Sequence, residues 1–296
     1  MAAGPILVAG RSGQLARCLI DSAAKRGIPL VAIGRPELDI EDANSIARTV
    51  RTVEPAAMIN AAAYTAVDRA EVESERAFAV NRDGAEHLAV EAKKRGVPFM
   101  HISTDYVFDG RKSSPYTEED AAAPLSIYGR SKLEGERAAR DACPATVVLR
   151  TSWIYSPYGH NFLKTMLRLA QAKDHIRVVD DQRGAPTAAN DLANAVLDIL
   201  GQLREGSESC GIYHVTAQGE TTWYGFASAI FATWQRRGYR VPQLEAITSA
   251  EFPTPARRPA NSRLDCAKVE RDFGIRLPAW QESVDACLER LATGRS

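Results

Sequence analysis

Tyr128 and Lys132 are the residues of this sequence whose types and spacing best suit acid–base chemistry. They lie four positions apart in a segment with good helix formers, and that spacing places both side chains on one helical face. A lysine ammonium near a phenol favours the phenolate, so we expect the Tyr128 pKa to fall from its ordinary value of about 10. A tyrosine tuned in this way can exchange a proton with a carbinol oxygen. Taken alone, the same spacing also fits two exposed side chains on a solvated helix.

Thr104 is expected to bring a hydroxyl to the same place. Residues 97–102 form a mostly apolar run that predicts a buried strand, and Thr104 then falls just past its carboxyl end within the motif S-T-D-Y. A threonine hydroxyl there could hold the oxygen with which Tyr128 exchanges a proton. The strand-end motif strengthens the interpretation of the Tyr–Lys pair as catalytic.

A glycine turn near the N-terminus predicts a dinucleotide site. Residues 6–9 read as a strand, and a helix is expected to follow the turn to about residue 26. Gly10, Gly13 and Ala16 give the pattern G-x-x-G-x-x-A between them. The glycines would let the backbone approach a pyrophosphate at the helix N-terminus, and Ala16 would let the helix pack close to the sheet. A plain tight turn is the simpler alternative.

Arg35 follows a second predicted strand at residues 29–33, where NAD-selective folds carry an acidic residue for the ribose. An arginine there suits a 2′-phosphate, so we favour NADPH and keep NADH as an open alternative. Arg35 could also be an ordinary exposed arginine. Asp39 is expected either near the adenine or at the start of a loop.

The predicted elements alternate between strands and helices, which indicates an α/β fold with a Rossmann-like, doubly wound parallel sheet. A third strand is expected at residues 57–60, and a long helix at 74–95 precedes the strand before Thr104. Ligands of such sheets bind at the carboxyl ends of the strands. We expect an NAD(P)-binding domain over 1–152 and a smaller, discontinuous substrate-binding lobe over 153–296, with segments near 187–216 returning to the first domain.

The second half offers further polar and aromatic candidates. Trp153 follows a predicted strand at 145–150 and could stack on a sugar or ring, or simply belong to the core. Gln182 lies beside a turn, where an exposed polar residue is common, and Thr187 is a plausible N-cap for the next helix. Arg258, in a proline-rich loop, could clamp a diphosphate or merely be solvated.

Composition limits the remaining possibilities. The 296 residues carry 37 Lys+Arg and 37 Asp+Glu, so no global field favours nucleic acid or a charged membrane surface. The five cysteines form no C-x-x-C pair, which argues against a zinc site or a disulfide framework. The N-terminal segment does not have the features of a signal peptide, and no apolar run is long enough to span a bilayer. We therefore expect a cytoplasmic protein.

Several motifs together resemble the extended short-chain dehydrogenase/reductases, and within them the dTDP-4-dehydrorhamnose reductases. They are the glycine turn with Gln14, N-A-A-A-Y-T-A-V-D (Asn60 to Asp68), S-T-D-Y-V-F-D-G (Ser103 to Gly110) and Y-G-R-S-K (Tyr128 to Lys132). More specific motifs continue the resemblance over nearly the whole chain: L-R-T-S-W-I-Y, N-F-L-K-T-M-L-R-L-A, D-Q-R-G-A-P-T and P-T-P-A-R-R-P-A-N-S-R-L-D.

The resemblance implies NADPH-dependent reduction of the C4 ketone of dTDP-4-dehydro-β-L-rhamnose, the last step of dTDP-L-rhamnose synthesis. Tyr128 would donate the proton, Lys132 would hold the nicotinamide ribose, and Thr104 would orient the carbonyl. The cofactor-binding residues it implies are Gly10, Gly13, Gln14, Leu15, Arg35, Asp39, Ile40, Ala62, Ala63, Tyr64, Tyr128 and Lys132. The substrate-binding residues it implies are Thr104, Asp105, Tyr106, Trp153, Gln182 and Arg258.

The sequence departs from the family pattern at a few positions. Some members bind magnesium through glutamates at a dimer interface, but two corresponding positions here are Cys18 and Asn190, which leaves Glu289. We therefore expect no metal ligands, and either a monomer or a homodimer. Tyr64 replaces a histidine that members often carry. Two alternatives stay open: a reductase of another nucleotide-linked 4-keto-6-deoxy sugar, and a non-catalytic NADP-binding regulatory subunit of the same fold.

Overall fold

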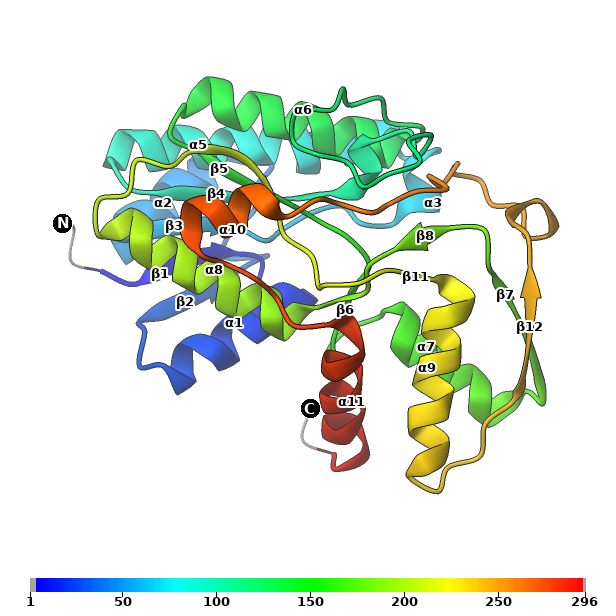
Figure 1. Cartoon of the computed structure of the whole chain (residues 1–296). Coiled ribbons are helices and arrows are strands. Elements are labelled where there is room, and N and C mark those ends of the chain that lie inside the picture. The colour runs from blue at the N-terminus through cyan, green and yellow to red at the C-terminus, as the bar shows by residue number, and fades with distance from the viewer. Residues whose placement is uncertain (1–3, 295–296) are drawn as a thin grey trace.

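A six-stranded, fully parallel sheet forms the centre of the larger part of the molecule (Figure 1). The computed structural model describes residues 4–294. The strands run in the order β10-β5-β4-β3-β1-β2 across the sheet. Their bounds are β1 (Ile6–Ala9), β2 (Leu30–Ile33), β3 (Ala57–Asn60), β4 (Phe99–Thr104), β5 (Val147–Thr151) and β10 (Gly211–His214). The predicted Rossmann-like, doubly wound sheet is confirmed.

The strand order changes direction between β1 and β3, and this point positions the glycine turn. Ala9 at the end of β1 is in register with Ile33 of β2 and Asn60 of β3. Gly10 and Ala61 therefore leave the sheet side by side at its carboxyl edge. Such a reversal is where doubly wound folds bind their ligands.

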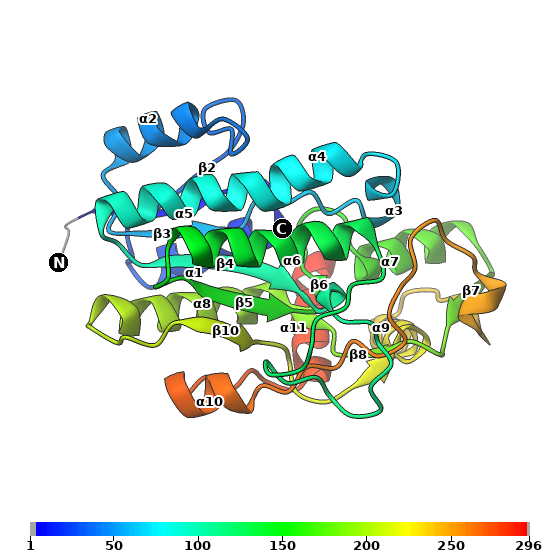
Figure 2. The same ribbon diagram turned by 90° about the horizontal axis from the view of Figure 1, so that it is seen from above.

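Helices cover both faces of the sheet (Figures 1 and 2). One face is covered by α2 (Ala43–Val53), α5 (Gly84–Arg95) and α6 (Ile127–Ala142), and the other by α1 (Gln14–Lys25), α8 (Ala189–Arg204) and α10 (Ala267–Phe273). Each layer buries its own cluster of aliphatic side chains against the strands. Because α8, β10 and α10 belong to this half, the chain returns to the sheet after leaving it at β5.

The helix expected over residues 74–95 is interrupted. It consists of α4 (Ser74–Phe78), a π-helical turn η1 (Ala79–Asp83) and α5. Asn81 in that turn is buried and holds the backbone of Tyr64 on one side and the hydroxyl of Ser131 in α6 on the other. Gly135 of α6 passes so close that a Cβ would lie 2.0 Å from the Asn81 carbonyl oxygen. The extra residue in the turn therefore positions Asn81 against the Tyr–Lys helix.

Two boundary predictions were wrong. The strand predicted to end at Ile102 extends to Thr104, the last residue of β4, because the pairing of Thr104 with Thr151 lengthens the ladder with β5. Thr187 is not a helix N-cap: it lies in the short strand β9 (Thr187–Ala188), and Ala188 caps α8. The Thr187 hydroxyl instead accepts a hydrogen bond from the Ala217 backbone and donates one to the Ala185 carbonyl.

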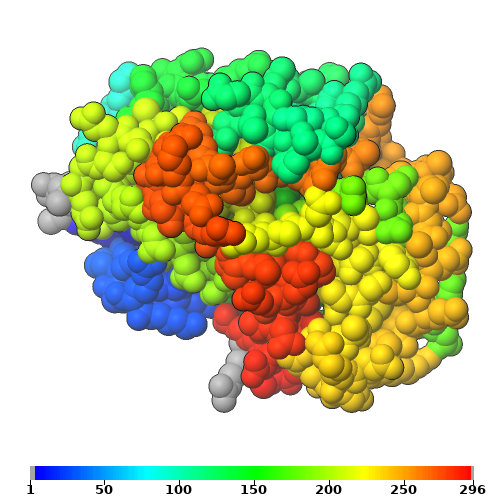
Figure 3. Space-filling view, viewed as in Figure 1, coloured from blue at the N-terminus to red at the C-terminus, as the bar shows by residue number. Residues whose placement is uncertain are grey.

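A smaller lobe with a separate apolar core lies beside the carboxyl edge of the sheet. Figure 3 shows its C-terminal helix packed between the sheet half and a neighbouring helix of the lobe. Its elements are β6 (Ile154–Tyr155), α7 (Phe162–Ala172), β7 (His175–Val179), β8 (Arg183–Gly184), β9, β11 (Thr221–Thr222), α9 (Trp223–Arg236), β12 (Gln243–Ile247), the 3-10 turn η3 (Ser249–Glu251) and α11 (Trp280–Ala292). The division into 1–152 and 153–296 stays our proposal.

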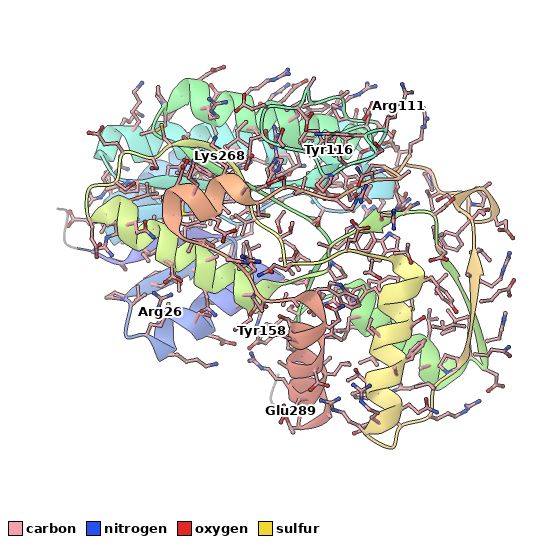
Figure 4. All side chains as sticks on the ribbon, viewed as in Figure 1. Arg26, Arg111, Tyr116, Tyr158, Lys268 and Glu289 are labelled. Atoms are coloured by element: carbon pink, nitrogen blue, oxygen red, sulfur yellow. The ribbon has the colours of Figure 1, made fainter. Side chains whose placement is uncertain are left out.

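A cluster of polar and charged side chains joins the lobe to α1. Tyr158, labelled in Figure 4, donates a hydrogen bond to Asp21 at 2.5 Å. The guanidinium groups of Arg17 and Arg290 lie 4.0 and 4.9 Å from the centre of the Tyr158 ring. No helix within residues 4–294 is long and apolar enough to cross a membrane.

Candidate active site

The Tyr–Lys pair lies on α6, and contacts with Ser126 and Tyr106 fix the first turn of this helix. The Ser126 hydroxyl caps the helix by accepting a hydrogen bond from the Gly129 backbone at 3.1 Å. A Cβ on Gly129 would lie 2.2 Å from the Tyr106 carbonyl oxygen, so only glycine allows this approach. The rings of Tyr106 and Tyr128 then meet edge to face, with centroids 5.6 Å apart.

The expected lowering of the Tyr128 pKa was wrong for the ligand-free protein. Burial raises the pKa of Tyr128 well above its ordinary value, a hydrogen bond with Thr104 lowers it, and the charge of Asp105 raises it further. The Lys132 amine lies 2.6 Å from the Ile102 carbonyl oxygen, to which it donates a hydrogen bond. Tyr128 is therefore a neutral phenol before any ligand binds, which is the form that can donate a proton.

Thr104 and Asp105 form the polar floor beside Tyr128. The Thr104 hydroxyl donates to the Asp105 carboxylate at 3.0 Å and accepts from the Tyr106 backbone at 3.2 Å. Asp105 is 2% exposed, and burial raises its pKa to about 6. Its Oδ2 atom is buried and has no hydrogen-bond partner of ordinary geometry, although the Ser262 hydroxyl lies near enough to lower the pKa of this carboxyl group. An unpaired buried acceptor is costly, and a sugar hydroxyl would satisfy it.

Arg258 reaches the same region from the proline-rich loop. Its guanidinium forms two hydrogen bonds with the Asp68 carboxylate, at 3.1 and 2.8 Å. Asp68 also accepts a hydrogen bond from the Ala256 backbone, so this carboxylate fixes both the loop and the arginine. Hydrogen bonding to Arg258 lowers the pKa of Asp68. The arginine is thereby held beside Tyr106, at the edge where the substrate-binding residues were expected.

Trp153 and Gln182 belong to one aromatic cluster in the lobe. The Trp153 ring stacks on Trp223 at 3.6 Å, and a Cβ on Gly184 would lie 2.6 Å from it. Trp153 has a φ of 48°, a conformation that its packing must stabilise. Gln182 accepts a hydrogen bond from the Trp223 indole and donates one to Ser249. Both predicted residues are thus held in place by Trp223, which the sequence analysis did not select.

A cavity of about 300 Å³ lies beside the glycine turn. Its lining includes half of the predicted cofactor-binding residues: Gly10, Arg35, Ile40, Ala62, Ala63 and Tyr64. The sequence analysis missed Arg11, Ser12, Gly34, Leu38, Arg76 and Val80, which line the same cavity. The remaining predictions lie elsewhere: Gly13 is the N-cap of α1, Leu15 is in the core, and Asp39 pairs with Arg35.

The backbone around this cavity fits a phosphate-bearing dinucleotide. Gly10 has a φ of 104°, and a Cβ there would lie 3.1 Å from the Ala62 backbone nitrogen. No side chain caps α1 at Gly13, so its first backbone N–H groups point toward the edge without a side-chain acceptor. The Gln14 side chain turns away and accepts hydrogen bonds from Ser156 and Asn161 of the lobe, which leaves its backbone for a cofactor.

Arg35 is one of three arginines that line the cavity, and it pairs with two carboxylates. Its guanidinium lies 3.1 Å from Asp39 and 2.5 Å from Glu41. Arg11, also on the lining, pairs with Glu37 at 2.9 Å and donates to the Arg35 carbonyl. Tyr64 donates its phenolic hydrogen to Glu73 at 2.8 Å, outside the cavity. Both arginines therefore pair with acidic side chains in the ligand-free protein.

Comparison with known proteins decides the family. The model of the RmlD substrate binding domain family matches residues 4–293. A dTDP-4-dehydrorhamnose reductase of Sinorhizobium fredii is 49% identical over 94% of this chain and 94% of the relative. The chain belongs to the dTDP-4-dehydrorhamnose reductase family. The corresponding reductase of Escherichia coli K12 is 40% identical over 97% of this chain and 98% of its own length.

Solved structures agree with this family assignment. A dTDP-4-dehydrorhamnose reductase of Clostridium acetobutylicum superposes with a TM-score of 0.91 and 35% identity, covering 97% of this chain and 99% of the other. The Bacillus anthracis reductase, solved in complex with NADP, has the same TM-score at 31% identity, with coverage of 97% and 99%. The chain is therefore an oxidoreductase of this family, with the fold that its motifs indicated.

Cys18, Asn190 and Glu289 lie on three different helices. Cys18 is fully buried, and burial raises the pKa of its thiol to about 12. Asn190 lies in the first turn of α8, and Glu289 lies on α11 (Figure 4). Over residues 4–294, no three His, Cys, Asp or Glu side chains are grouped so that they could hold a metal ion.

Proposed function

We propose that this chain catalyses the NADPH-dependent reduction of the C4 ketone of dTDP-4-dehydro-β-L-rhamnose to dTDP-L-rhamnose. The single observation that carries the proposal is the half-buried, neutral Tyr128, with the buried Thr104 and Lys132 around it, at the sheet edge that holds the dinucleotide cavity. The substrate follows from the family, whose curated relatives are named for this reaction. A nicotinamide cofactor is supported by the NADP bound in the Bacillus anthracis relative.

The catalytic residues of the chain act around the oxygen atom of the C4 ketone. When bound, the reduced nicotinamide supplies the hydride for C4. Tyr128 donates its phenolic proton to the oxygen that becomes the hydroxyl, and Thr104 orients that oxygen. Lys132 holds the nicotinamide ribose and steadies the phenolate that Tyr128 becomes. Asp105 accepts from the sugar through its unpaired Oδ2 atom.

The nucleotide part of the substrate is assigned to the lobe side of the edge. Arg258 offers a planar guanidinium, already aligned by Asp68, for bidentate contact with the diphosphate. Trp153, fixed on Trp223, offers an aromatic surface for a ring. Gln182 and Tyr106 complete the substrate-binding set.

The test follows NADPH oxidation by the purified protein. The substrate is generated in situ by the preceding enzymes of the pathway, and the product is identified as dTDP-L-rhamnose by chromatography against a standard. Rapid oxidation with that product supports the proposal. Bound NADPH that is oxidised only by a different nucleotide-linked 4-keto sugar would overturn the substrate assignment. NADPH that is bound but oxidised by none of these sugars would overturn the enzymatic role.

Arg35 is expected to set the preference for NADPH. Arg35→Ala should weaken NADPH binding about 10- to 100-fold and leave NADH binding nearly unchanged, because only NADPH offers a 2′-phosphate for charge-assisted hydrogen bonds. Titration of cofactor fluorescence measures both dissociation constants. Arg48→Ala is the control, since Arg48 is an exposed arginine on α2 outside the cavity lining. An equal loss for both cofactors in Arg35→Ala would contradict this role.

A further inference from the structure

A line of hydrogen bonds runs through the protein interior to Lys132. The Ala62 backbone N–H donates to Asn60 Oδ1 at 3.1 Å, and Asn60 Nδ2 lies 3.1 Å from His101 Nδ1. His101 Nε2 lies 3.3 Å from Lys132 Nζ, which also donates to the Ile102 carbonyl. Asn60, His101 and Lys132 are each at most 2% exposed, so no bulk water competes for these contacts.

The direction of this line is fixed at the Ala62 end. A backbone N–H can only donate, so the oxygen of the Asn60 amide must face Ala62 and its NH2 group must face His101. His101 Nδ1 is then the acceptor. A neutral imidazole with an unprotonated Nδ1 carries its hydrogen on Nε2, and that N–H points at Lys132.

His101 is neutral in this position. Burial lowers the pKa of His101 far below its ordinary value, and the nearby charge of Lys132 lowers it further. A second hydrogen on the ring, at Nδ1, would face the NH2 group of Asn60, so an imidazolium would oppose the Asn60 donor. One tautomer alone satisfies the line.

We propose that Asn60 and His101 form a hydrogen-bond line of fixed direction that presents an N–H donor to Lys132 and so makes the ammonium of Lys132 easier to deprotonate. An ammonium has three donors and no acceptor, and would oppose the His101 N–H. An amine accepts from His101, donates to the Ile102 carbonyl, and keeps one N–H for a ligand. Asn60 and His101 are thus positioning residues that act through Lys132.

Some of the groups around Lys132 lower its pKa and others raise it. Burial lowers the pKa of Lys132 to about 8, and the carboxylate of Glu136, one turn along α6, raises it. Arg150 of β5 pairs with Glu136 and offsets that charge. Asp105 lies on the turn after β4 and belongs to the site around Tyr128. The line through His101 adds to the effect of burial.

The consequence for catalysis rests on the proposed function, whereas the protonation state of Lys132 does not. Proton donation leaves Tyr128 as a phenolate, which an ammonium stabilises and an amine does not. Because the lowered pKa of Lys132 lies near neutrality, kcat/KM should fall as the pH rises through it. The line through His101 would then place the alkaline limit of activity close to working pH.

The test measures the titration of Lys132 in the ligand-free protein by NMR of ¹³Cε-labelled lysine. The resonance is assigned by its loss in Lys132→Met. In Asn60→Leu, His101 is free to carry its hydrogen on Nδ1 and to offer a lone pair to the ammonium. We expect the midpoint of Lys132 to rise by about one to two pH units. A packing role predicts the opposite sign, because an apolar replacement increases desolvation and lowers a lysine pKa.

Asn60→Asp provides a second, nearly isosteric variant in case Asn60→Leu folds poorly. Its carboxylate would accept from both Ala62 and His101, reverse the line, and raise the midpoint further. Asn81→Asp is the matched control, since Asn81 is equally buried and contacts Ser131 beside Lys132 but lies outside the line. A midpoint that is unchanged or lower in Asn60→Leu, or an equal rise in Asn60→Asp and Asn81→Asp, would overturn the proposal.

A kinetic measurement separates this inference from the proposed function. The alkaline limb of kcat/KM for NADPH oxidation should move to higher pH in Asn60→Asp by the same amount as the NMR midpoint. A shifted NMR midpoint in a protein with no reductase activity would support the hydrogen-bond line and reject the function. An active reductase whose Lys132 midpoint is unchanged by substitution of Asn60 would support the proposed function and reject the hydrogen-bond line.

Discussion

Tyr128→Phe is expected to lower turnover by about 10²- to 10⁴-fold while NADPH binding persists, because proton donation by a positioned side chain is worth that much. The substitution removes one hydroxyl and leaves the ring, so the edge-to-face contact with Tyr106 remains. Single-turnover measurement of NADPH oxidation gives the rate of the chemical step, and fluorescence titration gives the binding constant. The two readings together separate chemistry from binding.

The matched control for this substitution is Tyr116→Phe. Tyr116, labelled in Figure 4, is buried, stacks on Phe108 and donates its hydroxyl to Asp109. The Tyr116→Phe variant should oxidise NADPH at nearly the wild-type rate. A Tyr128→Phe protein that oxidises NADPH as fast as this control would remove Tyr128 from the mechanism, whereas loss of NADPH binding would show that the substitution damaged the cofactor site instead.

The sequence predicted the sheet well because each signal was local. Apolar runs ending at Ala9, Asn60 and Ile102 mark strands of a parallel sheet, and the carboxyl ends of such strands must share one edge. The glycine turn could be predicted for the same reason, since Gly10 both ends a strand and requires a positive φ. Boundaries such as that of Thr187 failed because a tertiary contact with Ala217 outweighs local capping.

The parts that sequence could not supply depend on residues far apart in the chain. Trp223 holds Trp153 from a distant segment, and no local pattern links the two. Arg76 reaches the cavity from α4, the helix before the π-helical turn η1. The sequence predicted one continuous α-helix there, and the turn changes which side chains face the cavity. The Tyr128 pKa was predicted in the wrong direction because spacing alone gives the presence of Lys132 but not the depth of burial.

Glu136→Ala should destabilise the fold by about 3–5 kcal/mol, since it leaves a buried arginine without its counter-ion. The Glu136 carboxylate accepts two hydrogen bonds from Arg150, at 2.9 and 2.7 Å, and one from Ser103 at 2.5 Å. Side-chain exposures of 3% and 2% place the ion pair in the interior, and one further Arg150 nitrogen already has no partner. Urea denaturation followed by circular dichroism measures the loss.

Two comparisons show whether the buried charge is the cause. Glu37→Ala breaks the exposed pair with Arg11 and should change the unfolding free energy little, because water screens such pairs. Combining Glu136→Met with Arg150→Met should recover much of the stability lost in Glu136→Ala, since no uncompensated charge remains. Because Glu136 lies one turn beyond Lys132 on α6, its loss should also loosen the helix that carries Tyr128. Equal destabilisation in the single and double variants would instead assign the effect to lost packing.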